Sequence, residues 1–376
     1  MVGGARFVDL AAKYAELRHA THNQKDHGRG GGGGYNTGTR DDGTLEVASW
    51  DSLDATTQGK LQAKMDDMFG GPNGLEVMEA NYTEVAERLV AEGGLEANVA
   101  NSKWYSEENA AAQAKVDGFN DGAATDAPTL TTEAYFGMVS VTSANKSWDS
   151  NKEFVDEWSN TLSKDPTVKV TQEMVADYNT HVSSTRQSVN QTHDLAAGEY
   201  RLSQLPPDMV MPMARHATNR QALADQGFAT PGLRNFNDGT KMMMIARGAP
   251  PDSIIKGPKQ RSFINNLTHP NSPVDVTHDI WDYRVAAGST PIKRGATGTK
   301  TMAEWEAEGK SPQDVMQSGP GYTQNKVKIW DSQNGIYPLV TVATKNATSA
   351  FNAEHGTSLL PLEFQAMIWV GVGGNA

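Results

Sequence analysis

The sequence predicts a mostly α-helical protein, and three observations carry this prediction. Several long segments repeat apolar residues three and four positions apart, which is the spacing of one face of an α-helix. Runs rich in β-branched residues are few and short, and they do not alternate with helices as in a parallel sheet. No similarity recurs at a fixed period, so a solenoid or propeller is not indicated.

Length and composition narrow the class further. The chain has 376 residues, which allows one large domain or two ordinary ones. It has no cysteine, which excludes disulfides, thiolate zinc sites and cysteine-bound iron–sulfur clusters. No apolar run is long enough to span a bilayer, and the N-terminus lacks the apolar core of a signal peptide. We therefore expect a cytoplasmic protein without a membrane partner.

The first 45 residues are expected to form a flexible, glycine-rich arm. The segment "HNQKDHGRGGGGGYNTGTRDDG" contains five consecutive glycines, but no Gly-Lys-Ser/Thr follows them, so it is not a phosphate-binding loop. His19, His22 and His27 raise the possibility of a metal site. A solvated tract is favoured, because no helix carrying histidine and carboxylate frames them.

The remaining chain divides into a helical extension over residues 46–100 and a main domain over 101–376. An irregular insertion at about 163–235 interrupts this domain. Caps and glycine stops mark the individual helices. Helices are expected at 49–70, 74–94, 102–118, 131–145, 147–162, 235–250, 301–309, 334–356 and 358–372.

One stretch, "GPKQRSFINNLTHPNSPVDVTHDIWDYRVA" (257–286), joins a Gly-Pro-Lys turn, a helix and a long loop. The loop leads to Asp279, which is followed by Trp281 and Arg284. This arrangement resembles the helix-hairpin-helix DNA glycosylases of the endonuclease III class. The resemblance implies a helical glycosylase-like domain whose hairpin amides hold a DNA phosphate. Lys259 would match the family's lysine, and Asp279 its aspartate.

A second stretch, "YFGMVSVTSANKSWDSNKEFVDEW" (135–158), is similar to another helix and turn of that family. There a polar residue near Asn145 would lie beside the DNA, and the stretches 135–158 and 257–284 would pack so that Asn145 and Asp279 face one cleft. The chain also resembles uncharacterised actinobacterial and phage proteins, which implies a phage origin and a place in the host cytoplasm. These share "SANKSWDSN", "GPKQRSF", "VTHDIWDYR" and "QAMIWV".

The resemblance implies a specific chemistry. A base is flipped out of the duplex, and cleavage of its N-glycosidic bond builds positive charge on the sugar. Asp279 would stabilise that charge, and Lys259 could attack the anomeric carbon. The base pocket would contain Trp281, Trp148, Arg284 and Gln365. The expected DNA contacts are Lys256, Gly257, Pro258, Lys259, Arg261, Asn145, Lys146, Lys293 and Arg294. No cofactor or metal is implied.

Net charge is −12, which is unusual for a DNA-binding protein, but residues 241–300 contain nine basic and four acidic residues. Such a local basic surface can still meet DNA, because salt limits the reach of charges to about 10 Å. The stretch departs from the family in the proline of its hairpin and in the length of the loop before Asp279.

Each residue also has a purely structural interpretation. Asp279 would serve equally as the N-cap of the helix that follows it. Lys259 could be a solvated lysine, Arg284 a partner of an acidic side chain, and Trp281 part of the core. Two functions therefore stay open. One is a DNA-binding enzyme that acts on an extruded base, by excision or by modification of phage DNA. The other is a non-enzymatic DNA-binding or virion-associated phage protein that retains the fold.

Overall fold

The computed structural model describes residues 38–69, 72–125, 127–142, 148–185, 192–209, 236–255, 257–287 and 337–372. Within these ranges the chain is mostly helical, which confirms the predicted class, and the described sheet has only two strands. Two compact units form. We call residues 108–256 the middle-segment unit, and residues 31–107 with 257–375 the two-segment unit.

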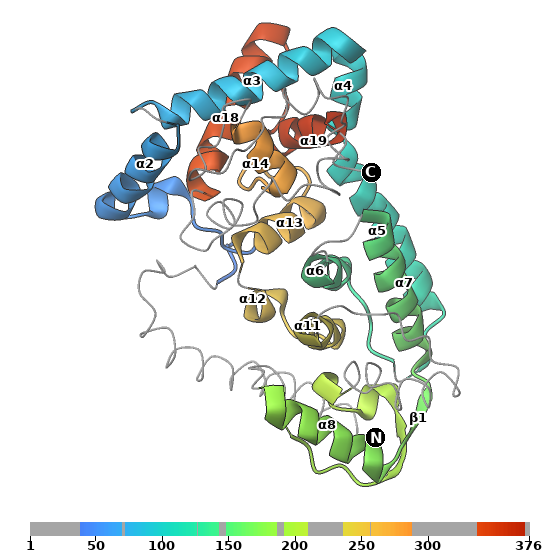
Figure 1. Cartoon of the computed structure of the whole chain (residues 1–376). Coiled ribbons are helices and arrows are strands. Elements are labelled where there is room, and N and C mark those ends of the chain that lie inside the picture. The colour runs from blue at the N-terminus through green and yellow to red at the C-terminus, as the bar shows by residue number, and fades with distance from the viewer. Residues whose placement is uncertain are drawn as a thin grey trace, which may run out of the picture. The chain divides into compact units, whose positions relative to one another are not determined.

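The two-segment unit brings the two ends of the described chain into one helical core. Helix α3 packs along α18 and against α14, and α19 packs against α4 (Figure 1). Residues 46–100, predicted as a separate extension, therefore share their core with the C-terminal helices. The elements are η2 (Trp50–Ser52), α2 (Ala55–Phe69), α3 (Gly74–Gly93), α4 (Leu95–Asn101), α13 (Pro258–Thr268), α14 (Ile280–Ala287), α18 (Tyr337–His355) and α19 (Pro361–Gly371).

Helix ends in this unit follow the local sequence. Gly94 stops α3 with a φ of 81°, and Gly356 follows α18 with a φ of 64°, a left-handed conformation that glycine adopts without steric cost. Pro258 and Pro361 occupy the first position of α13 and α19, where the missing N–H breaks no helical hydrogen bond. The stops at Gly94 and Gly356 lie where the sequence predicted them. Pro258 was expected in the turn before its helix, and α19 begins three residues after the predicted start at 358.

The core of the two-segment unit is made of large side chains from both ends of the chain. Met78 and Tyr82 of α3 are completely buried, as are Phe351 of α18 and Phe364 of α19. The rings of Phe351 and Phe364 lie 5.4 Å apart between centroids. Because these side chains come from distant segments, the unit requires both ends of the chain for its apolar core.

Helix α6 lies at the centre of the middle-segment unit and packs against α7 and α11. Every residue from Tyr135 to Thr142 is buried, within the helix predicted at 131–145. Gly137 allows the close approach of α11, because a Cβ atom there would lie 3.0 Å from Cγ2 of Ile245. The elements are most of α5 (Trp104–Asp121), α6 (Thr132–Thr142), α7 (Trp148–Lys164), β1 (Thr167–Val170), α8 (Gln172–Thr185), β2 (Gly198–Arg201), η3 (Leu202–Gln204), α11 (Phe236–Ala246) and α12 (Pro251–Ile254).

The predicted irregular insertion contains regular structure in its described part. Strands β1 and β2 pair antiparallel, with Thr167 opposite Arg201, and α8 lies between them in sequence. Arg247 donates hydrogen bonds to the carbonyls of Leu202 and Leu205 just after β2. Burial lowers the pKa of Arg247 to about 10, and the nearby carboxylates only partly oppose this. The buried guanidinium of Arg247 thus holds the turn that follows β2.

The last part of the predicted arm belongs to the two-segment unit. Residues 38–46 form a loop closed by a β-bridge between Thr39 and Leu45. Thr44 and Leu45 are 1 % and 2 % exposed, so this loop differs from the flexible arm expected over residues 1–45. Residues 1–37, with their three histidines, lie outside the described residues. Among the described helices, none combines the length and apolar character that crossing a bilayer requires.

We predict that Phe351→Ala lowers the free energy of unfolding by about 3–5 kcal/mol, because it opens a cavity in the shared core. Lys345→Ala on the same helix is the matched control and should change it by less than about 0.5 kcal/mol. Urea unfolding followed by circular dichroism measures both. Equal stability of the two variants would contradict the shared core.

Candidate functional site

The candidate site is built around residues 275–282, which lead into α14 in the two-segment unit. Asp275, Val276, Thr277 and His278 are all at most 5 % exposed. Asp279 is half-buried and is thus the first residue of this run to reach the surface. The position of its carboxylate therefore depends on how the four buried residues before it are held.

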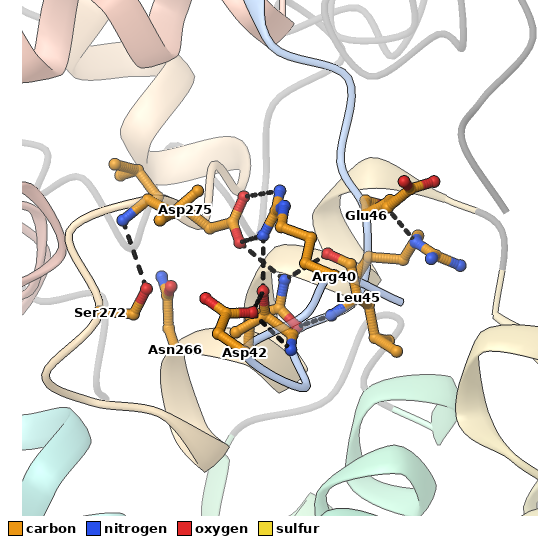
Figure 2. Close-up of polar contacts among 12 residues, drawn as sticks. Arg40, Asp42, Leu45, Glu46, Asn266, Ser272 and Asp275 are labelled. Atoms are coloured by element: carbon orange, nitrogen blue, oxygen red, sulfur yellow. Dashed lines mark hydrogen bonds and ion pairs between the residues drawn. The ribbon is translucent and has the colours of Figure 1, made fainter. Parts of the chain in front are cut away.

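Asp275 is anchored by a two-point ion pair with Arg40 (Figure 2). The Arg40 guanidinium donates from Nη1 to Oδ2 at 2.6 Å and from Nη2 to Oδ1 at 3.0 Å. Burial alone would lower the pKa of Arg40, but the hydrogen bonds and charge of Asp275 outweigh it and the pKa is raised. Asn265 of α13 donates to Asp275 Oδ2 at 2.7 Å. The start of the segment is therefore fixed from two sides.

Thr277 belongs to a buried polar cluster. The Asn266 amide lies 3.0 Å from the Thr277 hydroxyl; oriented to satisfy its partners, it accepts from the Thr277 N–H and donates to the Asp275 carbonyl, both at 3.1 Å. The hydroxyl of Tyr105 donates to Oε1 of Gln365 at 2.9 Å. Burial raises the pKa of the Tyr105 hydroxyl. Hydrogen bonds with Thr277 and Asn266 oppose this shift, and the negative charge of Asp279 adds to it. Asn266, Tyr105 and Gln365 thus bring polar groups from three other helices to the cluster around Thr277, two residues before Asp279.

His278 is completely buried and holds the segment against α18. Its Nδ1 is bonded to Oδ2 of Asp282, and its Nε2 lies 2.9 Å from Oγ1 of Thr341. Its backbone N–H donates to the Tyr337 hydroxyl at 3.2 Å, and that hydroxyl donates to the Val276 carbonyl at 2.8 Å. Burial raises the pKa of Asp282, and the neighbouring imidazole opposes that shift.

The order hydroxyl, imidazole, carboxylate in Thr341, His278 and Asp282 is that of a nucleophilic triad. The hydrogen bonding does not favour this chemistry. The Thr341 hydroxyl has a second acceptor within reach, the Tyr337 carbonyl at 3.1 Å one helical turn back, so it is not committed to the imidazole. We therefore assign these three residues to holding the segment in place.

Asp279 is the N-cap of α14. Its Oδ1 accepts the backbone N–H of Asp282 at 3.1 Å, and its carbonyl accepts the N–H of Tyr283 at 3.0 Å. The N-cap interpretation is confirmed, whereas a catalytic role for the same carboxylate stays a prediction. The two roles are compatible, because a carboxylate can accept more than one hydrogen bond.

The predicted Gly-Pro-Lys turn forms the start of α13. Gly257 is the N-cap in an extended conformation, Pro258 is the first helical residue, and Lys259 is the second and is half-buried. Gly257 itself has no side chain with which to cap this helix end. The boundary between the two compact units follows Lys256, within the predicted hairpin, so α12 and α13 belong to different units.

Arg261 differs from its predicted role in DNA binding. Its side chain is 1 % exposed, and its guanidinium donates to the carbonyls of Glu46 and Gly38. A phosphate cannot reach a guanidinium that is buried among backbone carbonyls. Arg261 instead fixes the loop 38–46 on α13. This pairing could not be predicted from local sequence, because the two segments are more than 200 residues apart.

Two residues predicted for the base pocket are engaged within the protein. Gln365 is 2 % exposed and accepts the Tyr105 hydroxyl, so it lies in the core and not on an open surface. Trp148 begins α7 in the middle-segment unit and is 9 % exposed. The ammonium of Lys152 lies 5.1 Å from the centroid of the Trp148 ring and covers one of its faces.

The side chains of the remaining predicted residues lie outside the described part of the structure. Trp281 and Arg284 lie on α14, but only their backbone is described, and the other positions lie outside the described residues. The contact expected between 135–158 and 257–284 joins residues of two different units and stays a prediction. The positions outside the described residues are Asn145, Lys146, Lys256, Lys293 and Arg294.

His278 and Asn266 were not among the residues predicted from the sequence. His278 and Asp282 are four residues apart, the spacing at which helical side chains meet, so "HDIWD" carried a usable signal. Asn265-Asn266 inside an otherwise regular helix was a second signal, because asparagine is a poor helix former that is retained where its amide is needed.

No protein-family model, curated protein or solved structure matches the chain.

The N-cap bond generates a prediction for Asp279. Asp279→Ala should lower the free energy of unfolding by about 1 kcal/mol, whereas Asp279→Asn should be nearly neutral, because asparagine caps about as well as aspartate. Guanidinium unfolding of the two variants beside the wild type measures the difference. Equal losses in both variants would mean that the charge, and not the cap, stabilises the fold.

Arg261→Ala should lower the free energy of unfolding by about 3 kcal/mol, because it removes the buried guanidinium that donates to the Glu46 and Gly38 carbonyls and opens a buried space. Lys259→Ala, two residues earlier on the half-buried helix start, should change it by less than about 0.5 kcal/mol. Differential scanning calorimetry compares them. A larger loss in Lys259→Ala would reverse the roles assigned to these residues.

Proposed function

We propose that this chain is a DNA-binding enzyme that acts on an extruded base, by glycosylase-like excision or by modification of a base in phage DNA. One observation carries the proposal. Asp279, half-buried at the start of α14, follows a segment that buried polar groups hold on both sides. An enzyme that stabilises charge at one point needs a carboxylate whose position is fixed before the substrate arrives.

The cost of the surrounding polar groups supports this interpretation. Buried amides, hydroxyls and charges stabilise a fold only when they are well paired, and apolar residues could fill the same space. Here Asn266, Thr277 and His278 are all buried, and each is bonded to a partner from another segment or a later turn. Such a network specifies one conformation of residues 275–282, which is what positioning Asp279 requires.

Lys259, on α13 of the same two-segment unit, is proposed either to bind a DNA phosphate or to take part in a covalent step. It stands at the second position of α13, where the positive end of the helix dipole favours an anion. In the proposed reaction Lys259 either holds a phosphate or attacks the anomeric carbon. In the second case the N-glycosidic bond breaks, the base leaves with a proton, and opening of the sugar ring gives a Schiff base. Lys256, Lys293 and Arg294 are the further proposed phosphate contacts, and Arg261 is no longer among them. The proposed site of action is the cytoplasm, that of the host if a phage encodes the chain.

The alternative is a non-enzymatic DNA-binding or virion-associated protein that retains the fold. The N-cap bond of Asp279 favours it, because the bond accounts for this residue without any chemistry. The burial of Gln365 favours it too, since an amide bonded inside the core does not read a base.

Asp279→Asn separates the two functions, because it preserves the cap and removes the charge. For the enzyme we expect DNA affinity within about twofold of wild type and loss of base release or modification, about 10²-fold or more. Binding should weaken steeply as salt rises, because phosphate contacts release counterions. Gel shifts and base-release assays on normal and base-modified DNA measure these quantities, and borohydride trapping in wild type and Lys259→Ala tests the Schiff base.

The control is the melting temperature of Asp279→Asn, which should equal that of the wild type. Unchanged turnover in this variant would leave Asp279 as a cap only. DNA binding without any base chemistry would support the non-enzymatic alternative. Absence of binding at low salt would refute the enzyme and every DNA-binding role, and would leave only the virion-associated one.

A further inference from the structure

A second group of chemically active side chains lies where α3 and α18 pack together, apart from the Asp279 site. Glu87 comes from α3, and Glu354 and His355 are the last two residues of α18. One ligand atom from each residue lies within 4.8 Å of the other two, and His355 Nε2 is 2.7 Å from Glu87 Oε1. We propose that these three residues bind a divalent first-row transition-metal ion of the Zn²⁺ type, which joins the two helices.

The donor set selects the class of ion. One imidazole nitrogen and two carboxylate oxygens suit Zn²⁺, Co²⁺ or Ni²⁺, whereas Mg²⁺ prefers oxygen ligands only. Zn²⁺ holds such atoms at about 2.0–2.2 Å, so its ligands lie about 3.4 Å from one another. Glu354 is exposed, and rotation of its side chain can close the remaining distance. Three protein ligands leave the fourth position to water.

Electrostatics at the end of α18 favour a cation. The C-terminal end of a helix carries partial negative charge, and a carboxylate there is unfavourable. Glu354 nevertheless stands in the last turn, beside Glu87 of the neighbouring helix, and His355 is the basic residue of that turn. A hydrogen bond between Glu87 and His355 accounts for those two residues and leaves Glu354 unexplained. A metal ion accounts for all three.

Packing prepares the imidazole for this role. The His355 ring lies 4.4 Å from the ring of Phe351 between centroids, and Phe351 is completely buried. The His355 side chain is 17 % exposed, so an ion from solvent can reach it while its orientation is held. Because α3 and α18 are packed along each other, the ligands approach the arrangement for binding before the metal arrives.

The test uses the full chain after treatment with a chelator that is then removed. Zn²⁺ at about 100 times its Kd should raise Tm by roughly 3–8 °C and bind with one ion per chain in calorimetry. Mg²⁺ at the same concentration should leave Tm unchanged. Co²⁺ should give visible absorption bands. Glu87→Gln and His355→Gln should each weaken Zn²⁺ binding at least about tenfold and abolish the rise in Tm.

Two controls locate the site. Glu84→Gln changes an exposed glutamate one turn before Glu87, and His269→Gln changes a histidine elsewhere in the unit; both should keep the full response to Zn²⁺. A triple glutamine variant of His19, His22 and His27 removes the histidines of the glycine-rich tract. Loss of binding in that variant, a full response in Glu87→Gln and His355→Gln, or no rise in Tm with wild type would overturn the proposal.

Discussion

The amide pair Asn265-Asn266 of α13 is the contact on which the positions of loop 38–46 and of residues 275–282 both depend. Asn265 accepts the N–H of Leu45 at 2.7 Å and donates to the Leu45 carbonyl at 2.8 Å, so it pairs with that residue as a strand would. It also donates to Asp275, while Asn266 binds Thr277. One turn of helix thereby holds an N-terminal loop on one side and the candidate site on the other.

Through these bonds, side chains that take no part in the proposed chemistry determine the conformation of the candidate site. Each unpaired buried amide or carboxylate would cost about 1–3 kcal/mol, so alternative positions of residues 275–282 are disfavoured together. Asp279 follows these fixed residues directly in the chain, so the position of its backbone is fixed as well. The cap bond from the Asp282 N–H to its carboxylate also restrains the side chain. A fixed carboxylate at a helix start suits an enzyme, and it equally suits a helix that simply begins there.

Local features were predictable and distant pairings were not. The ends of α3 and α18 followed from Gly94 and Gly356, and the burial of α6 followed from its apolar sequence, because each depends on neighbouring residues. The pairing of Arg261 with the loop 38–46, and of Tyr105 with Gln365, depends on which distant segments meet. Polarity alone suggested a DNA contact and a base pocket for Arg261 and Gln365, whereas tertiary packing placed both inside.

The division of one unit between the two ends of the chain has a consequence for synthesis on the ribosome. Tyr82 on α3 is completely buried, yet its neighbours on α18 are translated about 250 residues later. At ~5–20 residues per second, the apolar face of α3 waits roughly 12–50 s for its cover. Residues 108–256 emerge in the meantime as one continuous segment. The nascent chain thus has a period in which the early helices depend on chaperones, or on transient contacts, to stay soluble.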